Sequence, residues 1–431
     1  MKQKTINIIT LGCSKNLVDS EVMLRQLQAA GYQVYHDSDQ PAEIIVINTC
    51  GFIFDAKEES INTILDYTRL KSEGKISHLY VMGCLSERYR DELNAEIPEV
   101  DGFFGVNDMH ALLSALNAPF REALLGERVI TTPAHYAYLK IAEGCDHQCS
   151  FCAIPGIRGG NISKPIEQLM SEARFLASKG VKELLLIAQD LTYYGKDIYG
   201  KRQLSTLLEN LITIPEIKWI RLHYAYPVGF PMDVLDVMRN QPKICNYLDI
   251  PLQHITPRIL KSMKRGGGGD KIRKLVQTIR NKVPGIVLRS SFIVGYPDET
   301  ATEFNELKQF VQEARFERLG VFTYSHEEKT PAWKLTDNVR PAIKARRAEE
   351  LMLLQQEIVT QHNQELIGKV MPVIIDHQEN NFWIGRTEFD SPEVDNEVLI
   401  PVNDIPVEPG SIVNATITGT ELYDLTATIY P

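Results

Sequence analysis

The chain has 431 residues, of which 44% are hydrophobic and 24% charged, with a formal net charge of −10. This length and composition are typical of a soluble globular protein with two or three domains. No apolar stretch is long enough to span a bilayer, so we expect no membrane contact. The first residues, MKQKTI, lack the long apolar region of a signal peptide. We therefore expect a cytoplasmic protein, and its negative charge argues against broad nucleic-acid binding.

The first segment, residues 1–128, alternates short apolar runs with helical patterns. We expect strands at Thr5–Thr10, Glu43–Asn48 and Leu79–Met82, and helices at Asp19–Ala30, Asp55–Leu70 and Ser86–Ala95. Strands that alternate with helices in this way predict a parallel sheet covered by helices. The fold class expected for this segment is therefore α/β.

The second segment, residues 132–365, repeats the strand–helix rhythm six times. The expected strands are Tyr136–Ala142, Glu183–Gln189, Trp219–His223, Tyr247–Pro251, Val287–Val294 and Leu319–Tyr324. Six such units predict an open (β/α)6 partial barrel of the TIM type. The chemistry of such sheets lies at the carboxyl ends of the strands. A long helix over Pro341–Leu366, which begins with proline in its first turn, closes the segment.

The third segment, residues 366–431, contains five short β runs separated by Pro, Gly and Asn turns. They are Val370–Ile375, Phe382–Arg386, Glu397–Ile400, Ile412–Thr418 and Leu425–Ile429. This spacing predicts a small antiparallel β-barrel of the OB type.

The charge of the third segment is strongly negative. Its basic residues are Lys369 and Arg386, and its eleven acidic residues are Asp376, Glu379, Glu388, Asp390, Glu393, Asp395, Glu397, Asp404, Glu408, Glu421 and Asp424. Such a surface would repel nucleic-acid phosphates and attract a basic protein. The alternative is a generic acidic surface that serves only solubility.

Three cysteines follow the first expected strand of the second segment in the run EGCDHQCSFC. Cys145, Cys149 and Cys152 have the spacing C-x3-C-x2-C. Three thiolates on one tight loop suit three irons of a [4Fe–4S] cluster, and the lack of a fourth cysteine nearby leaves one iron open to another ligand. The alternative is a zinc loop, which normally needs four ligands. His147 could supply the fourth only awkwardly, from inside the loop.

Three further cysteines each follow an expected strand of the first segment and lie beside a glycine. They are Cys13, Cys50 and Cys84. Because parallel strands end at the same edge of a sheet, their thiols are expected to converge there, and glycine lets the backbone approach a bulky ligand. We therefore expect a second [4Fe–4S] cluster; three small buried side chains are the alternative. Cys245 has no partner motif and is expected in the core.

These features, in this order, resemble the methylthiotransferase family of radical S-adenosylmethionine (SAM) enzymes over essentially the whole chain. The runs LGCSKNLVDSE at 11–21, GCDHQCSFCAIPGIRG at 144–159 and LDIPLQH at 248–254 resemble the branch that modifies an aspartate of a ribosomal protein. The sister branch modifies an adenosine of transfer RNA. That branch typically carries Gln-Met-Asn where Ser14-Lys15-Asn16 stands here.

The resemblance implies two [4Fe–4S] clusters and SAM as cofactors. A low-potential electron, from a donor such as flavodoxin or ferredoxin, would enter the cluster on Cys145, Cys149 and Cys152 and cleave SAM. The resulting 5′-deoxyadenosyl radical would abstract hydrogen from an unactivated carbon, and the second cluster would deliver the methylated sulfur. The implied substrate is the basic ribosomal protein S-twelve, free or on the small subunit, at an aspartate β-carbon.

The resemblance also implies contacts to SAM. They are Phe151 beside the adenine, Gln189 and Asp190 at the end of the second strand, and Arg289 and Ser291 on the fifth. Each of these residues could instead serve loop packing or satisfy nearby backbone groups.

Two alternatives to the aspartate-modifying enzyme stay open. One is the tRNA-adenosine methylthiotransferase, which the acidic third segment disfavours, since we expect no direct tRNA binding. The other is a two-cluster electron-transfer or RNA-binding protein without radical chemistry.

Overall fold

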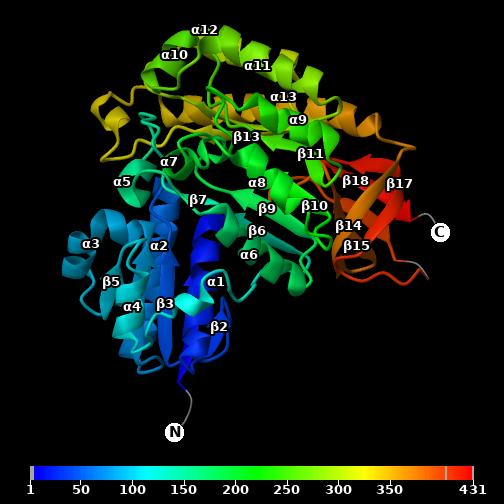
Figure 1. The fold of residues 1–431 in the computed structure, drawn as a ribbon. Helices are drawn as coiled ribbons and strands as arrows, with labels where there is room; N and C mark the ends of the chain where they lie inside the picture. The colour runs from blue at the N-terminus through cyan, green and yellow to red at the C-terminus, as the bar shows by residue number, and fades with distance from the viewer. Residues whose placement is uncertain (1–3, 403–404, 430–431) are drawn as a thin grey trace.

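The protein is described from a computed structural model, which covers residues 4–402 and 405–429. The described residues form a five-stranded sheet, a six-stranded sheet and a closed barrel in sequence order, together with a short two-stranded sheet, and the six-stranded sheet lies between the five-stranded sheet and the barrel (Figure 1). Within the described ranges, no helix is both long and apolar enough to cross a membrane. The first three residues, on which the signal-peptide expectation partly depends, and the acidic residue Asp404 lie outside the described residues.

The N-terminal sheet has five parallel strands in the order β2-β1-β3-β4-β5. The strands are β1 (Thr5–Thr10), β2 (Gln33–His36), β3 (Ile44–Thr49), β4 (His78–Gly83) and β5 (Gly102–Phe104). The helices are α1 (Ser14–Ala29), α2 (Phe54–Ser72), α3 (Cys84–Glu96) and α4 (Met109–Ala115), and a 3-10 turn follows at Glu122–Leu124. The three expected strands are confirmed. Folds with this strand order bind ligands where the order reverses, beyond the carboxyl ends of β1 and β3.

The six-stranded sheet is parallel, with the order β13-β12-β11-β10-β9-β6. Its strands are β6 (Tyr136–Lys140), β9 (Glu183–Ile187), β10 (Trp219–Leu222), β11 (Ile244–Asp249), β12 (Val287–Val294) and β13 (Arg318–Thr323). The outer helices are α6 (Ile166–Ser178), α8 (Leu204–Leu211), α9 (Met232–Asn240), α10 (Pro257–Ser262), α11 (Gly268–Lys282), α12 (Ala301–Ala314) and α13 (Pro341–Gln364). This arrangement confirms the open (β/α)6 partial barrel.

Short elements complete this part of the chain. They are β7 (Ala142–Glu143), which pairs with β8 (Ile162–Ser163), the helices α5 (Ile154–Arg158) and α7 (Lys196–Tyr199), and 3-10 turns at Leu191–Tyr193 and Pro331–Lys334. The two faces of the large sheet differ because successive strand residues point to opposite sides. Leu184, Leu186 and Leu222 belong to the core beneath the outer helices. The opposite face carries polar and aromatic residues such as Arg221 and Tyr247.

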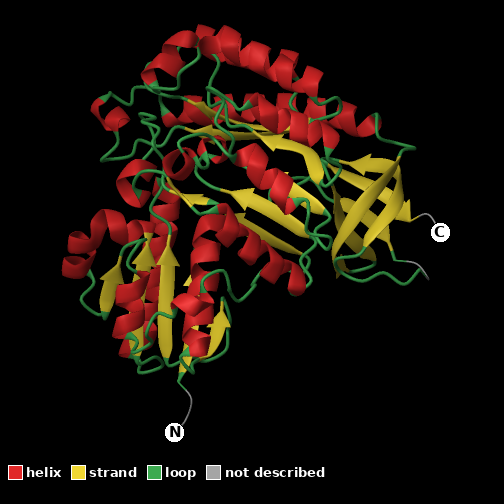
Figure 2. Cartoon of the chain, in the orientation of Figure 1, coloured by secondary structure: helices red, strands yellow, loops and turns green. Residues whose placement is uncertain are grey.

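The C-terminal barrel is closed in the order β14-β15-β16-β18-β17 (Figure 2). Its strands are β14 (Val370–Glu379), β15 (Phe382–Thr387), β16 (Val398–Pro401), β17 (Ile412–Glu421) and β18 (Asp424–Ile429). The five expected strands are confirmed, but the barrel is not wholly antiparallel, because Val398 of β16 pairs in parallel with Leu425 of β18. The strand β18 therefore runs in the same direction as β16, whereas every other neighbouring pair in the barrel is antiparallel.

A loop of the C-terminal barrel, residues 388–397 between β15 and β16, packs against the inner face of the partial barrel. We call it the plug loop. Asp390 accepts a hydrogen bond from Arg318 Nε at 2.9 Å. Asp395 accepts one from Tyr247 Oη at 2.6 Å, and Glu393 accepts one from Tyr136 Oη at 3.0 Å. The plug loop therefore fixes the C-terminal barrel to the strands of the six-stranded sheet.

These contacts correct the expectation of a uniformly acidic docking surface. Among the described acidic residues of the third segment, Asp376 pairs with His135 and Arg386, and Asp390 pairs with buried Arg318. The exposed ones are Glu379, Glu393, Glu397, Glu408 and Glu421, and Glu393 among them also accepts hydrogen bonds from Tyr136 and Tyr138. Much of the negative charge is thus neutralised inside the molecule, because a sequence count does not distinguish surface charges from those in internal ion pairs.

The Arg318–Asp390 pair predicts a large loss of stability when it is broken. Asp390 is 1% exposed and Arg318 5% exposed, so Asp390→Ala would leave a buried guanidinium without its carboxylate. We expect the free energy of unfolding to fall by about 3–5 kcal/mol, measured by chemical denaturation. The exposed Glu408→Ala is the matched control and should change it little. Equal stability of the two variants would show that the pair does not hold the plug loop.

Candidate active site

The structure brings Cys13, Cys50 and Cys84 together at the carboxyl edge of the N-terminal sheet. Cys13 precedes α1, Cys50 follows β3, and Cys84 begins α3, so they follow three adjacent strands. Gly12 has φ +92°, and a Cβ on it would lie 2.7 Å from Cys50 Cβ. Burial, opposed by the Arg158 guanidinium and assisted by the neighbouring Cys13 and Cys50 thiols, raises the pKa of Cys84 to about 12. These three side chains are called the auxiliary cysteines.

The loop that carries Cys145, Cys149 and Cys152 lies between β7 and α5. The backbone N–H of Cys145 donates to the carbonyl of Gly159 at 3.0 Å, and that of Cys152 donates to the carbonyl of Cys149 at 3.1 Å. Burial raises the pKa of Cys145 to about 11 and that of Cys152 to about 12, and the Cys149 thiol adds to both shifts. We call this segment, residues 144–153, the cysteine loop.

Contacts with the segments that follow β11 and β13 of the six-stranded sheet hold the cysteine loop in place. Ser150 donates from its N–H to the carbonyl of Met263 at 2.9 Å and from its Oγ to the carbonyl of Ser262 at 2.7 Å. The carbonyl of Ser150 accepts from the N–H of Ala332 at 2.7 Å. Phe151 is half-buried and packs against an apolar cluster that includes Met263 and Tyr296. Hydrogen bonds and apolar packing therefore anchor the loop at its centre.

His147 and Asp190 form a second anchor. His147 Nε2 lies 2.8 Å from Asp190 Oδ2, and its ring stacks on Tyr226 with centroids 3.6 Å apart. Asp190 Oδ1 accepts a hydrogen bond from the N–H of Thr192 at 2.8 Å. A zinc ion on His147 Nε2 would have to displace Asp190. The contacts of Asp190 in this structure orient His147, and its role toward SAM stays a prediction.

Arg265 is a residue of the site that sequence reasoning missed. Its Nη1 lies 3.7 Å from Cys149 Sγ, and its guanidinium lies 4.4 Å from the centroid of the Tyr226 ring. Its Nε is buried without a hydrogen-bond partner. A guanidinium here opposes the burial that raises the pKa of Cys152. No sequence motif predicted Arg265, because its contact with Cys149 joins residues 116 positions apart in the chain.

Arg158 of α5 lies between the two cysteine sets. Its Nη1 lies 2.8 Å from Glu143 and 3.3 Å from Asp19. Its Nη2 donates a hydrogen bond to Asn16 Oδ1 at 2.5 Å. The same Asn16 Oδ1 lies 3.9 Å from Cys84 Sγ. Burial lowers the pKa of Arg158, but the nearby Asp19 carboxylate and Cys84 thiol outweigh it and raise that pKa.

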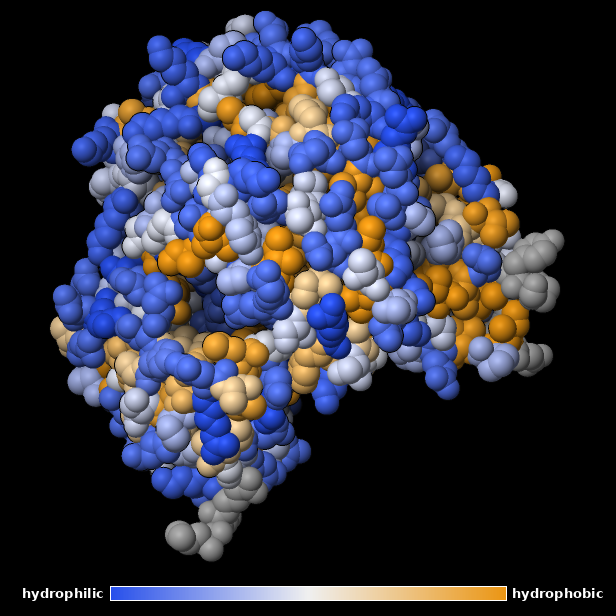
Figure 3. Space-filling view, in the orientation of Figure 1, coloured by the Kyte–Doolittle hydropathy of each residue, from blue (hydrophilic) through white to orange (hydrophobic). Residues whose placement is uncertain are grey.

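Apolar packing joins the two sets as well, because Ala153 and Ile157 of the α5 region pack against Cys84. Figure 1 shows α5 above the carboxyl edge of the N-terminal sheet. The space-filling view is hollowed in this region, with hydrophobic side chains on the rim (Figure 3). Cys13 is the exposed member of the auxiliary cysteines. The two cysteine sets therefore face one seam, which is open to solvent on one side.

The remaining predicted SAM contacts divide into two groups. Gln189 donates to Glu143 Oε1 at 2.9 Å, and its own Oε1 is buried without a partner. Ser291 is buried on the same strand, β12, as Arg289. Arg289, however, turns toward the plug loop, where it pairs with Asp395 at 3.2 Å and with Asp249 at 3.5 Å. The role of all three toward SAM stays a prediction, and Arg289 already has two carboxylate partners.

The buried polar atoms near the cysteine loop allow a test of whether a polar cofactor fits. Gln189 Oε1 and Arg265 Nε lack partners, and such groups are uncommon in folded proteins. Three thiols with a guanidinium beside them suit an anionic iron–sulfur cluster. The unpartnered acceptor and donor suit a ligand that carries both amino and carboxylate groups. The residues present therefore fit the cofactors that the sequence predicts.

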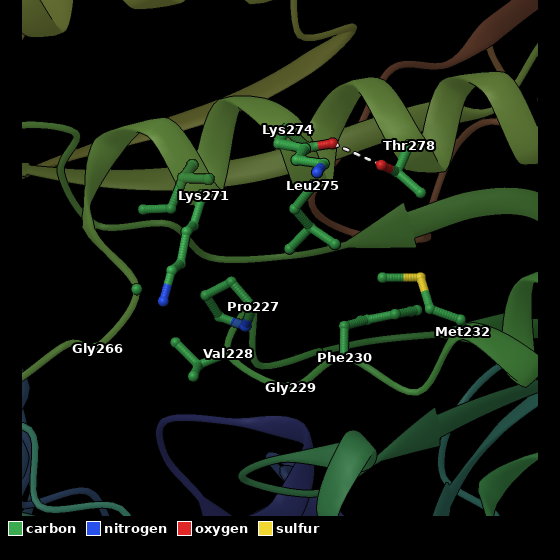
Figure 4. A pocket seen from close by; sticks show the side chains of 12 residues that line it. Pro227, Val228, Gly229, Phe230, Met232, Gly266, Lys271, Lys274, Leu275 and Thr278 are labelled. Carbon is green, nitrogen blue, oxygen red and sulfur yellow. Dashed lines mark hydrogen bonds between the residues drawn. The ribbon is translucent and has the colours of Figure 1, made fainter.

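A separate groove lies outside this seam. It has a volume of about 390 Å³ and runs between α11 and the loop after β10 (Figure 4). Its lining is mostly apolar, with two lysines, and includes Val228, Phe230, Lys271, Lys274 and Leu275. Because no cysteine or carboxylate lines it, we assign it no part in the chemistry.

Comparisons with known proteins agree with this architecture. Residues 5–105 match the uncharacterized protein family UPF0004, residues 139–311 match the radical SAM superfamily, and residues 367–429 match the TRAM domain. Among solved structures, the radical SAM methyltransferase TsrM from Kitasatospora setae, with tryptophan and a SAM analogue bound, superposes with a TM-score of 0.60 at 11% identity. The match covers 84% of this chain and 90% of that one. It shows a shared fold.

Relatives of much higher identity carry one name, ribosomal protein uS12 methylthiotransferase RimO. The protein from Christiangramia forsetii is 55% identical over 99% of this chain and 94% of its own length. The one from Flavobacterium psychrophilum is 56% identical over 99% and 98%, and the one from Phocaeicola vulgatus is 52% identical over the full length of both. At this identity and coverage, the chain belongs to the ribosomal protein uS12 methylthiotransferase family of radical-SAM enzymes.

Proposed function

We propose that this chain replaces a C–H hydrogen by a methylthio group on the β-carbon of an aspartate of ribosomal protein uS12, the small-subunit protein S-twelve. The observation that carries the proposal is the pair of three-cysteine sets that face one seam, joined through Arg158 and Asn16. Full-length relatives named for uS12 support the ribosomal protein as substrate over tRNA. A protein that only carries electrons would not need a site open to a further ligand.

We assign the cysteine-loop thiolates of Cys145, Cys149 and Cys152 to one [4Fe–4S] cluster and the auxiliary cysteines to the other. Within residues 4–402 and 405–429, no three His, Cys, Asp or Glu side chains are arranged as ligands of a single ion. An iron–sulfur cluster requires a wider spacing of its ligands than a single ion does, because each cysteine binds a different iron. The raised pKa values of Cys84, Cys145 and Cys152 mean that metal-free thiols carry protons, which cluster assembly would release.

The chain's own residues supply position and charge at these sites. When bound, the cluster of the cysteine loop and SAM supply one-electron cleavage and a radical able to take hydrogen from an unactivated carbon. Asp190 orients His147, and Ser150 anchors the loop at its centre. Arg265 places positive charge beside Cys149. These contacts fix the positions of the cysteine loop and of the side chains around it, which favours reaction at a single geometry.

Each of the three segments would have a separate role in the reaction. We propose that residues 1–128 carry the auxiliary cluster, residues 132–365 carry the radical chemistry, and residues 366–431 dock the substrate. Exposed acidic residues of the C-terminal barrel, among them Glu397 and Glu421, support docking of a basic protein. The electron would come from a low-potential donor such as flavodoxin or ferredoxin. Because its substrate is a ribosomal protein, we place the enzyme in the cytoplasm.

Substrate choice tests the proposed function. Anaerobically reconstituted enzyme receives SAM, a strong reductant, a sulfur source, uS12 and unmodified tRNA in parallel reactions. Mass spectrometry should find one hydrogen replaced by a methylthio group on a uS12 aspartate and no change in the tRNA. A methylthio group on the tRNA alone would move the chain to the sister branch. SAM cleavage without transfer to either molecule would also contradict the proposal.

Arg158 gives a prediction about the auxiliary cluster. Its buried guanidinium is connected to Cys84 through Asn16, whose Oδ1 contacts both side chains. A nearby positive charge favours the reduced form of a cluster. We expect Arg158→Met to lower the midpoint potential by on the order of 60 mV, a tenfold change in a one-electron equilibrium. A redox titration followed by electron paramagnetic resonance (EPR) measures it. Arg158→Lys should keep most of the potential, and an unchanged value in Arg158→Met would contradict this role.

A further inference from the structure

A buried ammonium group lies in the seam without a carboxylate partner. Lys15, in the first turn of α1, is 7% exposed, and its Nζ lies 3.3 Å from the centroid of the Tyr224 ring. Among the residues that the structure describes, no carboxylate forms an ion pair with this Nζ, and the buried Asp249, which pairs with Arg289, interacts with the Lys15 charge only from farther away. Two other cations of the seam differ, since Lys140 and Arg158 both pair with Asp19 and Glu143.

An unpaired buried cation is costly, because the ammonium loses its hydration without gaining an opposite charge. Charged residues are almost never fully buried unless they are paired. The face of an aromatic ring attracts a cation but does not replace a carboxylate. An anion that arrives with a ligand would supply the missing partner of this ammonium.

The position of Lys15 directs its charge toward the reaction site. It is two residues beyond Cys13, and the neighbouring Val18 packs against Tyr138 and Ile187 on the inner face of the partial barrel. The first turn of α1 thus enters the seam between the two cysteine sets.

Tyr224 is held at the mouth of the partial barrel, just beyond β10. It adopts φ +62°, its N–H donates to Asp249 Oδ2 at 3.2 Å, and its carbonyl accepts from the N–H of Leu191 at 3.2 Å. Chemistry in parallel barrels occurs at these strand ends. The ring therefore holds the Lys15 ammonium where a substrate would enter.

Two other cationic candidates nearby are already committed. Arg289 pairs with Asp249 and Asp395, and Arg221 pairs with buried Glu183 at 2.8 Å. Burial and the cations Arg221, Arg289 and Lys15 hold the pKa of His223 well below its usual range. Among the described residues of this region, two buried cations therefore lack a carboxylate partner. Arg265 lies beside Cys149 of the cysteine loop, and Lys15 lies beside Tyr224 at the mouth of the partial barrel.

We propose that Lys15 binds the carboxylate of the substrate aspartate and so places its β-carbon between the two cysteine sets. The reacting carbon is bonded directly to the carboxyl carbon, so an ion pair to the carboxylate fixes the atom that loses hydrogen. The inference rests on the proposed function.

The test compares uS12 with uS12 whose modified aspartate, located by mass spectrometry, is replaced by asparagine. Each is titrated anaerobically into reconstituted enzyme with SAM but no reductant, and binding is followed by fluorescence anisotropy of labelled uS12. Wild-type enzyme should prefer the aspartate form by roughly tenfold to a hundredfold, the range of one charged hydrogen bond. Lys15→Met should bind both forms equally, and Lys15→Arg should recover most of the preference. The exposed Lys201→Met is the matched control and should behave as wild type.

Iron content and cluster EPR spectra separate this role from one toward the clusters. Both should be unchanged in Lys15→Met. A retained aspartate preference in Lys15→Met would overturn the inference, as would a loss of clusters that accounts for weaker binding. If Lys15→Met fails to fold, Lys15→Gln takes the same test with the same expected result. If wild-type enzyme binds neither form of uS12, the proposed function itself fails, which is distinguishable from failure of the Lys15 assignment alone.

Discussion

Replacing Cys149 with alanine is expected to abolish the reductive cleavage of SAM by this enzyme. The cysteine loop offers three thiols and no fourth, so the loss of one leaves too few ligands to hold a cluster. Ser150 and the neighbouring backbone anchor the loop without metal, so the fold should survive the change. The measurement is formation of 5′-deoxyadenosine from SAM under a strong reductant, with iron content per chain determined on the same sample.

The control for this experiment is another buried cysteine. Cys245 belongs to an apolar cluster with Trp219 and Tyr247 and lies outside both cysteine sets. Cys245→Ala should therefore keep the full iron content and the SAM cleavage of the wild type, whereas Cys149→Ala should lose roughly half the iron, since one of two clusters is gone. Undiminished SAM cleavage by Cys149→Ala would mean that the radical cluster lies elsewhere.

Cys84→Ala should separate the two halves of the reaction. Cys84 lies on the opposite side of the seam from the thiols of the cysteine loop and is linked to that loop through Asn16, Arg158 and the packing of the α5 region. We expect this variant to cleave SAM yet to leave uS12 without a methylthio group, because the cluster that delivers sulfur is missing. Chromatography of 5′-deoxyadenosine and mass spectrometry of uS12 give both readouts from one reaction.

Two results would contradict that expectation. Methylthiolation of uS12 at the wild-type rate would show that Cys84 holds no cluster needed for sulfur transfer. Loss of SAM cleavage together with transfer would show that the two sites depend on one another. In the second case, the iron content of Cys84→Ala distinguishes collapse of both sites, with little iron left, from a loss of electron transfer, with about half of it left.

The sequence predicted the placement of the cysteines because the physics involved is local. Thr5–Thr10 and Val287–Val294 are strands with the expected bounds, and residues after neighbouring parallel strands meet at one edge. Two strands of the N-terminal sheet, β2 and β5, escaped prediction. β2 has four residues that are half-buried or exposed and β5 has only three residues, so neither gives a recognisable apolar run.

Contacts between residues distant in the chain could not be predicted. Arg265 reaches Cys149 across 116 positions, and Arg318 reaches Asp390 across 72. No local pattern encodes such pairs, because they depend on how whole sheets are packed. The same limit misled the charge argument, which counted Asp376, Asp390 and Asp395 as surface charges. Lys15 lies in the run LGCSKNLVDSE, on which the family resemblance partly rests. Its lack of an ion-pair partner, however, is evident only in the fold.

The most direct test of the account is the magnetic interaction between the two clusters. If both cysteine sets face one seam, two reduced clusters must lie close enough for their electron spins to couple. The EPR spectrum of fully reduced wild-type enzyme should then differ from the sum of the Cys149→Ala and Cys84→Ala spectra, with broadening that the single-cluster variants lack. A wild-type spectrum equal to that sum would place the clusters far apart and contradict the arrangement on which the proposed function depends.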